Sequence, residues 1–513
     1  MTESVPLAAS GLSSPGRTLL DSMQMTAINQ VLFKDVQGDI LAGGLPKKYE
    51  IFSFFTIRPD KVKSFCVNLG NATGDGMLTF SSVQNILDER QKFQTMFPAV
   101  SDKGVDGAGG SRHWVPSVGA NIAFSFRGLK KMSAVLATDL QLGSLPSISD
   151  GPFTRGMKED ATRLADPPSA FAAGTPFGDG QIDGVLIVAG SNDWIVNAAL
   201  SGVMGILGFT KDASSTIAEV SREIGNVREG PNDGKEHFGF EDGVSQPIVR
   251  GVNDKGADRK VPGNVINLDV ILTGYDATHE KQQWMRNGSF LCFRKLEQHV
   301  DKWDKAVKEL AEKAEDRVEL VGAKLMGRWP SGAVRSCFPR LRTTRKKASN
   351  SFPDFNQLPA GPELDDPMCP PGAHIRKVNP RDSKFDQGGI HRIIRRSITY
   401  GPDFKSGNLN DPVNKQSRGL LFACYQSDLS HGFDFIQTRW ANKPDFPIKR
   451  AGLDLVMGQT GTNDPNQMDV VFKKGKVSHS FSGINQFVEC KGGEYFFSPS
   501  FTAMHGALSK VKN

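Results

Sequence analysis

The sequence predicts an α+β fold, and two observations support this prediction. Seven segments are rich in Phe, Ile and Val and are bounded by Gly, Asn or Pro, a composition typical of buried β-strands. A further stretch has the periodicity of an amphipathic helix. The predicted strands are residues 49–57, 121–128, 184–190, 268–274, 289–296, 419–425 and 494–498.

The clearest helical pattern lies just after the fifth predicted strand. Its apolar residues recur three or four positions apart, whereas Lys, Asp and Glu occupy the positions between them. The apolar face consists of Val300, Trp303, Val307, Leu310 and Ala314. Because Trp303 belongs to this face, we expect it to pack in a core.

The overall composition excludes a membrane-spanning chain. The protein has 513 residues, of which 38% are hydrophobic and 23% charged, enough for two or more cores. No apolar run approaches the roughly 20 residues that a spanning helix needs. The segment Met1 to Lys34 lacks the basic start, apolar block and cleavage site of a secretory signal. An intracellular location is therefore expected by default, with non-standard export as the alternative.

Charge and cysteine spacing exclude further classes of function. The net charge of +6 is modest, and the densest basic run, 340–347, has no interleaved aromatic residues for base stacking. We interpret this run as a solvated loop and expect no nucleic-acid partner. The six cysteines are widely scattered without a C-x-x-C pair, which disfavours zinc sites, iron–sulfur sites and a dense disulfide framework.

Loop-forming composition suggests how the chain is divided. Residues 225–234 are rich in Gly, Asn, Pro and Asp, which is typical of a surface connection. We therefore predict a flexible N-terminal segment at 1–34, a first domain at 35–230 and a second domain at 231–513. A second loop-rich tract, 349–371, leads directly into His374.

Two short segments and an arginine cluster carry the residue types needed for peroxide chemistry at a haem. His374 could hold the iron through one ring nitrogen, while a partner binds the other nitrogen. Asp242 could move a proton between the peroxide oxygens, and Arg395 could stabilise the developing charge. Residue types alone leave alternatives open, because Asp-Gly is typical of a turn and most arginines lie at the surface. His237 and His391 are rival iron ligands.

Taken together, these segments resemble the dye-decolorizing peroxidase family in its longer fungal form. The resemblance runs in order from Val36 to Ser498. Its segments are Val36–Leu41 with Gly44-Leu45-Pro46, the GxxDG signature within Gly239–Pro247, Gly288–Leu296, Gly327-Arg328-Trp329, Ala373–Arg381 and Arg392–Gly401.

The resemblance implies a role for each of the chemical residues. His374 becomes the proximal iron ligand of one haem b per chain, and Asp242, followed by Gly243, becomes the distal acid–base residue. Arg395 becomes the distal arginine, with Arg396 as the alternative.

The resemblance also implies which residues surround the haem. Asn379, Pro380 and Arg381 match the stretch that lines the haem and its propionates. Leu420 and Phe422 match the apolar residues that cap the distal pocket. Asp454 is the candidate to accept a hydrogen bond from the His374 ring.

For the whole chain, the resemblance implies two ferredoxin-like α+β domains with antiparallel sheets, of the dimeric α+β barrel type, with haem mainly in the second. The implied function is peroxidase: hydrogen peroxide would oxidise bulky dyes, phenolics or other one-electron donors. Tyr400 and Trp440 are candidate surface oxidation sites, although both are equally typical of packing aromatics. A homo-oligomer is compatible with the sequence.

The sequence departs from the family at a few positions, and two other interpretations remain. Pro371-Gly372 stands where the family more commonly has an aromatic residue and a small residue. Ser397 stands where the family usually has Gly or Asn, and Thr399 where it usually has Pro. One alternative is a haem-binding sensor or carrier that uses the thiolate of Cys369. The other is a noncatalytic binding module without haem.

Overall fold

A computed structural model describes most of the chain. The described residues are 32–73, 79–96, 117–142, 151–253, 265–275, 283–333, 369–381, 385, 389–449, 451–460, 466–474, 477–484 and 486–512. Most of the predicted N-terminal segment, the basic run 340–347 and most of the tract 349–371 lie outside these residues.

The first half of the chain forms a four-stranded antiparallel sheet with the order β4-β1-β3-β2. Its strands are β1 (Tyr49–Ile57), β2 (Val118–Phe124), β3 (Gly184–Gly190) and β4 (Ile217–Asn226). Helices α2 (Val62–Asn71) and α3 (Val83–Met96) separate β1 from β2, and α8 (Asp193–Ile206) separates β3 from β4. This β-α-β-β-α-β succession is ferredoxin-like.

The second half repeats the same arrangement. Its strands are β7 (Ser289–Gln298), the short β8 (Ile394–Arg395) and β9 (Ile398–Tyr400), β10 (Gly419–Gln426) and β13 (Val488–Ser498). The order is β13-β7-β10-β8, and β9 also pairs with β10. Helices α9 (Val300–Lys313) and α10 (Val318–Met326) follow β7. The two halves therefore share one topology.

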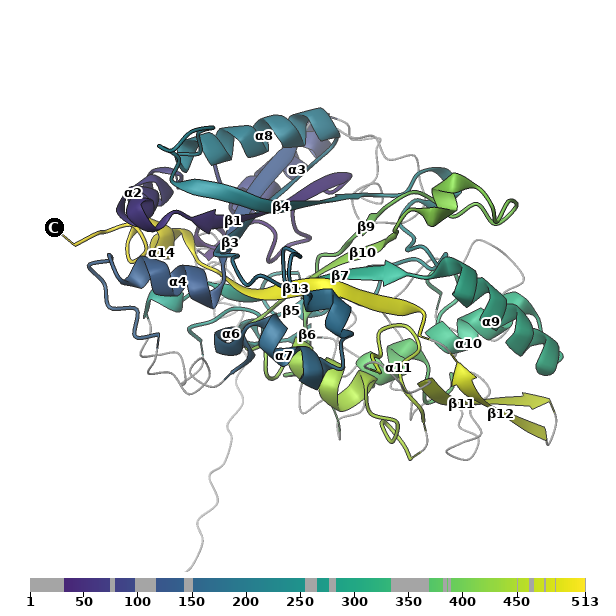
Figure 1. Ribbon diagram of the computed structural model, residues 1–513. Helices are drawn as coiled ribbons and strands as arrows, with labels where there is room; N and C mark the ends of the chain where they lie inside the picture. The colour runs from purple at the N-terminus through teal and green to yellow at the C-terminus, as the bar shows by residue number, and fades with distance from the viewer. Residues whose placement is uncertain are drawn as a thin grey trace, which may run out of the picture.

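The two sheets are joined at β2 and β13, where Phe124 pairs with Phe497. The opposite edges of the two sheets also lie close together. Thr399 of β9 donates from Oγ1 to the carbonyl oxygen of Asn226 in β4 at 2.6 Å. In Figure 1, β13 crosses the middle of the molecule, with α8 and α3 on one side of the strands and α9 and α10 near one end. This arrangement confirms the predicted α+β barrel of antiparallel strands.

The remaining elements are mostly short connections between the strands, apart from a separate two-stranded antiparallel sheet formed by residues 466–474 and 477–484. They are η1 (Pro59–Lys61), α4 (Phe126–Ser133), α6 (Pro152–Arg155), α7 (Met157–Leu164), η3 (Pro168–Phe171), η4 (Gly230–Asn232), β5 (Ile248–Val249), β6 (Val265–Ile266), η5 (Leu268–Val270), η6 (Gln283–Met285), α11 (His374–Val378), η8 (Pro412–Lys415), α13 (Phe433–Phe435), the π-helix η9 (Ile436–Ala441), β11 (Asn466–Lys474), β12 (Val477–Ile484) and α14 (Phe501–His505).

Most predicted strands are confirmed, and two predictions need correction. Residues 268–274 form a 3₁₀ turn and bends because their apolar side chains enter the core from a loop. The strand predicted at 121–128 ends at Phe124, and Ser125 caps α4 by accepting the N–H of Gly128. The limit between the predicted domains at 230 and 231 stays a prediction; it falls between β4 and the loop that carries Asp242.

Trp303 packs in a core, as predicted. Its side chain is 3% exposed and stacks on Phe238 with ring centroids 4.7 Å apart. Phe240 contacts the same indole edge-on. Because Phe238 and Phe240 lie four and two residues before Asp242, this aromatic cluster anchors the Asp242 loop on α9.

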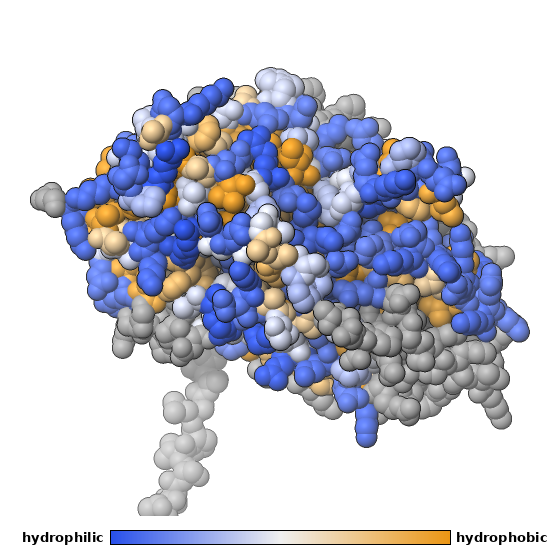
Figure 2. All heavy atoms as spheres, viewed as in Figure 1, coloured by the Kyte–Doolittle hydropathy of each residue, from blue (hydrophilic) through white to orange (hydrophobic). Residues whose placement is uncertain are grey.

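Hydrophilic side chains predominate on the face shown in Figure 2, and hydrophobic ones are scattered among them. Within the described parts of the chain, every helix is too short or too polar to cross a bilayer.

Candidate active site

An open cavity lies against the sheet of the second half. Arg294, Leu296 and Gln298 of β7 line it, as do Leu420 and Phe422 of β10. These alternate residues share one face because side chains in a strand point to opposite sides in turn.

Asp242 and Arg395 meet in this cavity. Nη1 of Arg395 donates to Oδ1 of Asp242 at 2.6 Å, and the N–H of Gly243 donates to the same oxygen at 2.6 Å. Burial alone would raise the pKa of Asp242, but the charge and hydrogen bond of Arg395 and the Gly243 N–H outweigh it. The pKa of Asp242 is therefore held below its ordinary value.

Gln246 holds the backbone of Arg395 in place. Its Nε2 donates to the Arg395 carbonyl oxygen at 2.8 Å, and its Oε1 accepts the Arg395 N–H at 3.1 Å. The sequence alone indicates no role for Gln246, although this residue belongs to the Gly239–Pro247 segment. The contact of Gln246 with Arg395 is visible only in the folded structure, where this loop lies against β8.

Glu236 shapes the turn that leads to Asp242. Its carboxylate accepts the N–H groups of Phe238 and Phe240 at 2.8 and 2.9 Å. Gly239 lies between them with a φ of 94°, a conformation that favours glycine. These contacts give the loop a defined shape before it enters the cavity.

His374 enters the cavity from the first position of α11. Its Nδ1 lies 2.8 Å from Oδ2 of Asp454, which is fully buried. Burial would raise the pKa of Asp454, but the His374 ring and the N–H groups of Val456 and Met457 outweigh burial and lower it. The ionised carboxylate orients the ring and leaves Nε2 as its other nitrogen.

The structure brings some of the other sequence-predicted residues to this cavity and keeps others away. Asn379, Leu420, Phe422 and Gly243 line it. Pro380 and Arg381 are buried outside its lining, and so is Asp454, which contacts the cavity residue His374.

The rival residues occupy different settings. His237 lies outside the cavity lining, with its Nε2 at 2.9 Å from the Tyr400 carbonyl oxygen. His391 does line the cavity, but its Nδ1 is 2.6 Å from the His431 carbonyl oxygen. Arg396 lies outside the lining and donates from Nε to the Asp39 carbonyl oxygen.

The thiolate alternative has no geometric support. Cys369 is fully buried and lies outside the cavity lining. The carbonyl oxygen of Cys369 accepts a hydrogen bond from Arg376.

Tyr400 and Trp440 are buried, at 6% and 3% exposure, so neither is itself a surface site. The Tyr400 hydroxyl bonds to Ser417 Oγ at 3.1 Å, and the Lys295 ammonium lies over its ring. The Trp440 ring stacks on Phe446 and meets His391 edge-on, each at a centroid distance of 5.3 Å.

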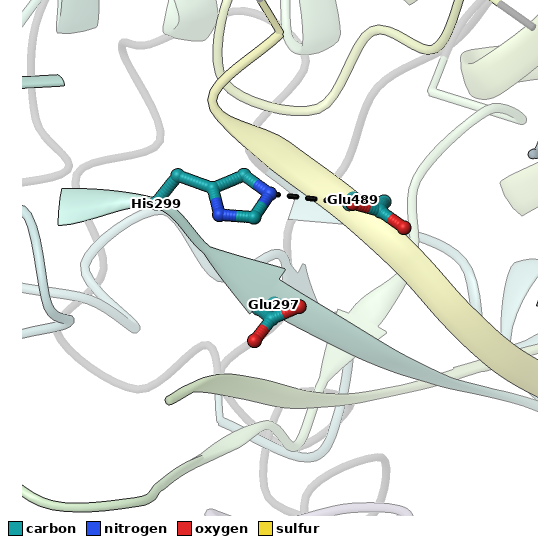
Figure 3. A group of neighbouring side chains, drawn as sticks. All are labelled: Glu297, His299 and Glu489. Carbon is teal, nitrogen blue, oxygen red and sulfur yellow. Dashed lines mark hydrogen bonds and ion pairs between the residues drawn. The ribbon is translucent and has the colours of Figure 1, made fainter. Parts of the chain in front are cut away.

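A second group of potential metal ligands lies behind the cavity wall. Figure 3 shows Glu297 and His299 at the end of β7 facing Glu489 of β13, with His299 bonded to Glu489. Glu297 points away from the cavity, because its neighbours Leu296 and Gln298 point into it. The Lys491 ammonium lies 3.3 Å from Glu297 and 3.1 Å from Glu489, so both carboxylates already have a counter-charge.

Comparisons with known proteins agree with this geometry. Residues 35–229 match the DyP dimeric alpha+beta barrel domain, and residues 235–446 match the C-terminal domain of Dyp-type peroxidases. The chain is 31% identical to a dye-decolorizing peroxidase of Auricularia auricula-judae, covering 93% of this chain and 86% of the relative. It is 30% identical to Peroxidase 2 of Mycetinis scorodonius, covering 93% and 87%.

Solved structures show the same similarity. An ancestral D-type dye decolorizing peroxidase superposes with a TM-score of 0.76 at 32% identity, covering 93% of this chain and 99% of the other. A dye-decolorizing peroxidase from Pleurotus ostreatus gives a TM-score of 0.77 at 30% identity, with the same coverage. With its double ferredoxin-like barrel, this chain belongs to the family of DyP-type peroxidases, which are haem-dependent oxidoreductases.

Proposed function

We propose that the cavity holds one haem b, with Nε2 of His374 as the iron ligand. The observation that carries this proposal is that the Asp242–Arg395 pair and the oriented His374 ring line one cavity. A histidine that ligates a metal normally donates its other ring N–H to a carboxylate or carbonyl group. The 2.8 Å contact with buried Asp454 supplies that partner.

The residues of the cavity fit a flat, largely apolar cofactor. Leu420, Phe422, Val456 and Met457 give it apolar walls. Oδ1 of Asn379 is buried without a hydrogen-bond partner among the described residues, as expected where a polar edge of a ligand would lie. The sequence has no C-x-x-C-H motif for covalent haem attachment, which favours haem b.

Haem, when bound, supplies the iron that receives the oxidising equivalents of hydrogen peroxide. The protein supplies the acid–base chemistry. Both hydrogen bonds that described residues donate to the Asp242 carboxylate fall on Oδ1, and Oδ2 is the oxygen that takes a proton from one peroxide oxygen and returns it to the other. The Arg395 guanidinium stabilises the negative charge that develops as the O–O bond breaks and water leaves.

We further propose dyes and phenolics as donors, with Trp440 as the relay for donors too large for the cavity. Trp440 contacts His391 of the cavity on one side and the partly buried Phe446 on the other. Tyr400 is a poorer relay because burial raises the pKa of its hydroxyl, which opposes the proton loss that accompanies tyrosine oxidation.

Absorption spectra with added haemin test the iron ligand. We expect a Soret band in the wild-type protein that His374→Ala abolishes or shifts and that Cys369→Ala leaves unchanged. A spectrum that responds to Cys369→Ala and not to His374→Ala would overturn the assignment.

Rapid mixing of the haem-loaded protein with hydrogen peroxide tests Asp242. We expect Asp242→Asn to slow the spectral change by about 10²- to 10⁴-fold, the usual contribution of a general acid–base group. Glu229→Gln is the control, since the Glu229 side chain is 84% exposed. An undiminished rate in Asp242→Asn would remove Asp242 from the mechanism.

A further inference from the structure

Lys377 is a fully buried lysine whose ammonium group is completely satisfied by backbone oxygens. Its Nζ donates to the carbonyl oxygens of Lys443 at 2.8 Å, Phe446 at 2.7 Å and Gly452 at 2.7 Å. An ammonium group has three N–H donors, so each one has an acceptor. The Phe446 ring also lies 5.9 Å from Nζ.

The three acceptors belong to the segment that carries the partner of His374. Lys377 lies three residues after His374 on α11, and Gly452 lies two residues before Asp454. Four contacts therefore join α11 to this segment: the three hydrogen bonds of the Lys377 ammonium, and the contact of His374 with Asp454. Lys443 and Phe446 accept hydrogen bonds from the same ammonium group as Gly452. The Lys377 side chain therefore contacts both ends of the 443–454 segment.

Helix α11 by itself gives this arrangement little support. Helix α11 has five residues and lacks a side-chain cap. In the segment, the N–H groups of Lys443, Phe446 and Ala451 close short turns, and two longer backbone bonds run from the Gly452 N–H to Pro444 O and from the Asp454 N–H to Ala441 O. A short helix facing a loop needs additional contacts to keep a side-chain pair at hydrogen-bond distance.

Burying this charge is costly. Lysine is among the residues that are least often fully buried. Burial lowers the pKa of Lys377 to about 8, although Asp454 and Asp445 favour the charged form. An apolar side chain would fill the same space without desolvating a charge. What the ammonium adds is a defined geometry for three carbonyl groups.

We propose that Lys377 is a positioning residue: its ammonium fixes the 443–454 segment so that Asp454 meets Nδ1 of His374. Resting on the proposed function, this inference extends to the haem iron. A strong Nδ1–H to carboxylate bond makes the imidazole a better electron donor and favours the ferric state. Loss of Lys377 would loosen that bond and raise the reduction potential of the iron.

The test is a double-mutant cycle on the haem-loaded protein, with the ferric/ferrous midpoint potential and the Soret position as readouts. We expect positive shifts of the potential in Lys377→Met and in Asp454→Asn. The double variant Lys377→Met/Asp454→Asn should shift no further than Asp454→Asn alone, because Lys377 acts through Asp454. An unchanged potential in folded Lys377→Met, or additive shifts in the double variant, would overturn the inference.

Lys131→Met is the matched control. The Lys131 ammonium also has three partners, Thr56 Oγ1, Ile57 O and Asp183 Oδ2, but it lies in the first half of the chain. Its removal should lower the melting temperature without moving the potential. An equal shift of the potential in Lys131→Met would indicate a general effect of destabilisation and contradict the positioning role.

A measurement without haem separates this inference from the proposed function. In the apoprotein, the His374 Nδ1–H proton should give a downfield NMR signal that disappears in Asp454→Asn and is lost or shifted upfield in Lys377→Met. An unaffected signal in Lys377→Met overturns the clamp, whatever the iron ligand is. If the signal responds as expected but His374→Ala retains the wild-type Soret band, the clamp stands and the iron ligand is wrong.

Lys377→Arg is a second variant in case the methionine variant does not fold. It keeps the charge and several donors, so we expect a shift of the same sign but smaller. If neither variant takes up haem while Asp454→Asn does, Lys377 is required for folding rather than for positioning, and the inference fails.

Discussion

Arg395 donates from Nη1 to Oδ1 of Asp242 over 2.6 Å, although 153 residues separate them in the chain. The pair forms because β8 carries Arg395 to the cavity edge where the Asp242 loop returns. Its consequence is electrostatic. An aspartate taken out of water would tend to be protonated, and the guanidinium reverses that tendency. The proposed proton acceptor is therefore ionised at mildly acid pH.

Arg395→Leu should move the acid limb of the kcat/KM profile for peroxide to higher pH. Asp242 must be ionised to accept a proton, so activity is lost as the pH falls through its pKa. Without Arg395, its charge and hydrogen bond no longer offset the effect of burial on Asp242. The pKa of Asp242 therefore rises from its lowered value. Steady-state profiles between pH 2.5 and 7, chosen to bracket the ordinary aspartate pKa of about 3.9, would reveal the shift. Arg439→Leu, at an exposed position, is the control. An acid limb that stays in place would contradict the role of the pair.

Gln246→Leu should slow the reaction with peroxide while leaving haem uptake intact. The change leaves the N–H and carbonyl groups of Arg395 without their side-chain partner. Each such loss costs about 1–3 kcal/mol where the group stays buried, so the melting temperature should also fall. Gln246→Glu keeps an acceptor for the Arg395 N–H and should retain more activity. Equal rates in wild type and Gln246→Leu would show that the clamp is dispensable.

His237 should make the protein less stable in acid. Burial and the nearby Arg228 lower the pKa of His237 from 6.5 to about 4, so the folded state holds the ring neutral. Between these values the unfolded chain binds the proton more readily, and the free energy of unfolding falls as the pH drops from 6.5 towards 4, by up to about 3 kcal/mol.

Denaturant unfolding at several pH values, compared with His237→Gln, would measure this contribution. The variant should lose less stability over the same pH range. His505→Gln, at an exposed position, should behave like the wild type. Parallel curves for His237→Gln and the wild type would refute the assignment.

Trp440→Phe should reduce the oxidation of bulky dyes and spare small phenols. A phenylalanine keeps the stacking on Phe446 but is much harder to oxidise. Tyr400→Phe is the paired control and should leave both activities unchanged, because its hydroxyl is buried and bonded to Ser417. Turnover of a large anionic dye and of a small phenol, measured in both variants, shows whether Trp440 or Tyr400 is the relay. Dye turnover that survives Trp440→Phe would eliminate this relay.

Strands and a helix with regularly repeating apolar side chains are predictable from the sequence. β1, β3, β7 and β10 were predicted at or near their limits because a buried strand needs a run of Phe, Ile and Val. β4 was missed because, as an edge strand in IAEVSREIGN, it keeps many polar side chains partly exposed. Residues 268–274 were wrongly predicted because burial alone does not distinguish a strand from an apolar loop.

The sequence also predicts roles for Asp242, His374 and Arg395, since each belongs to a short segment that resembles its counterpart in the family, and it offers Asp454 as a candidate partner of the His374 ring. Tertiary structure alone decided the rest. It showed that Gln246 clamps Arg395, that Lys377 gathers the segment before Asp454, and that Trp440 is buried. These facts depend on contacts between distant parts of the chain. A hydrogen bond depends on the distance between two atoms, which local residue patterns do not specify.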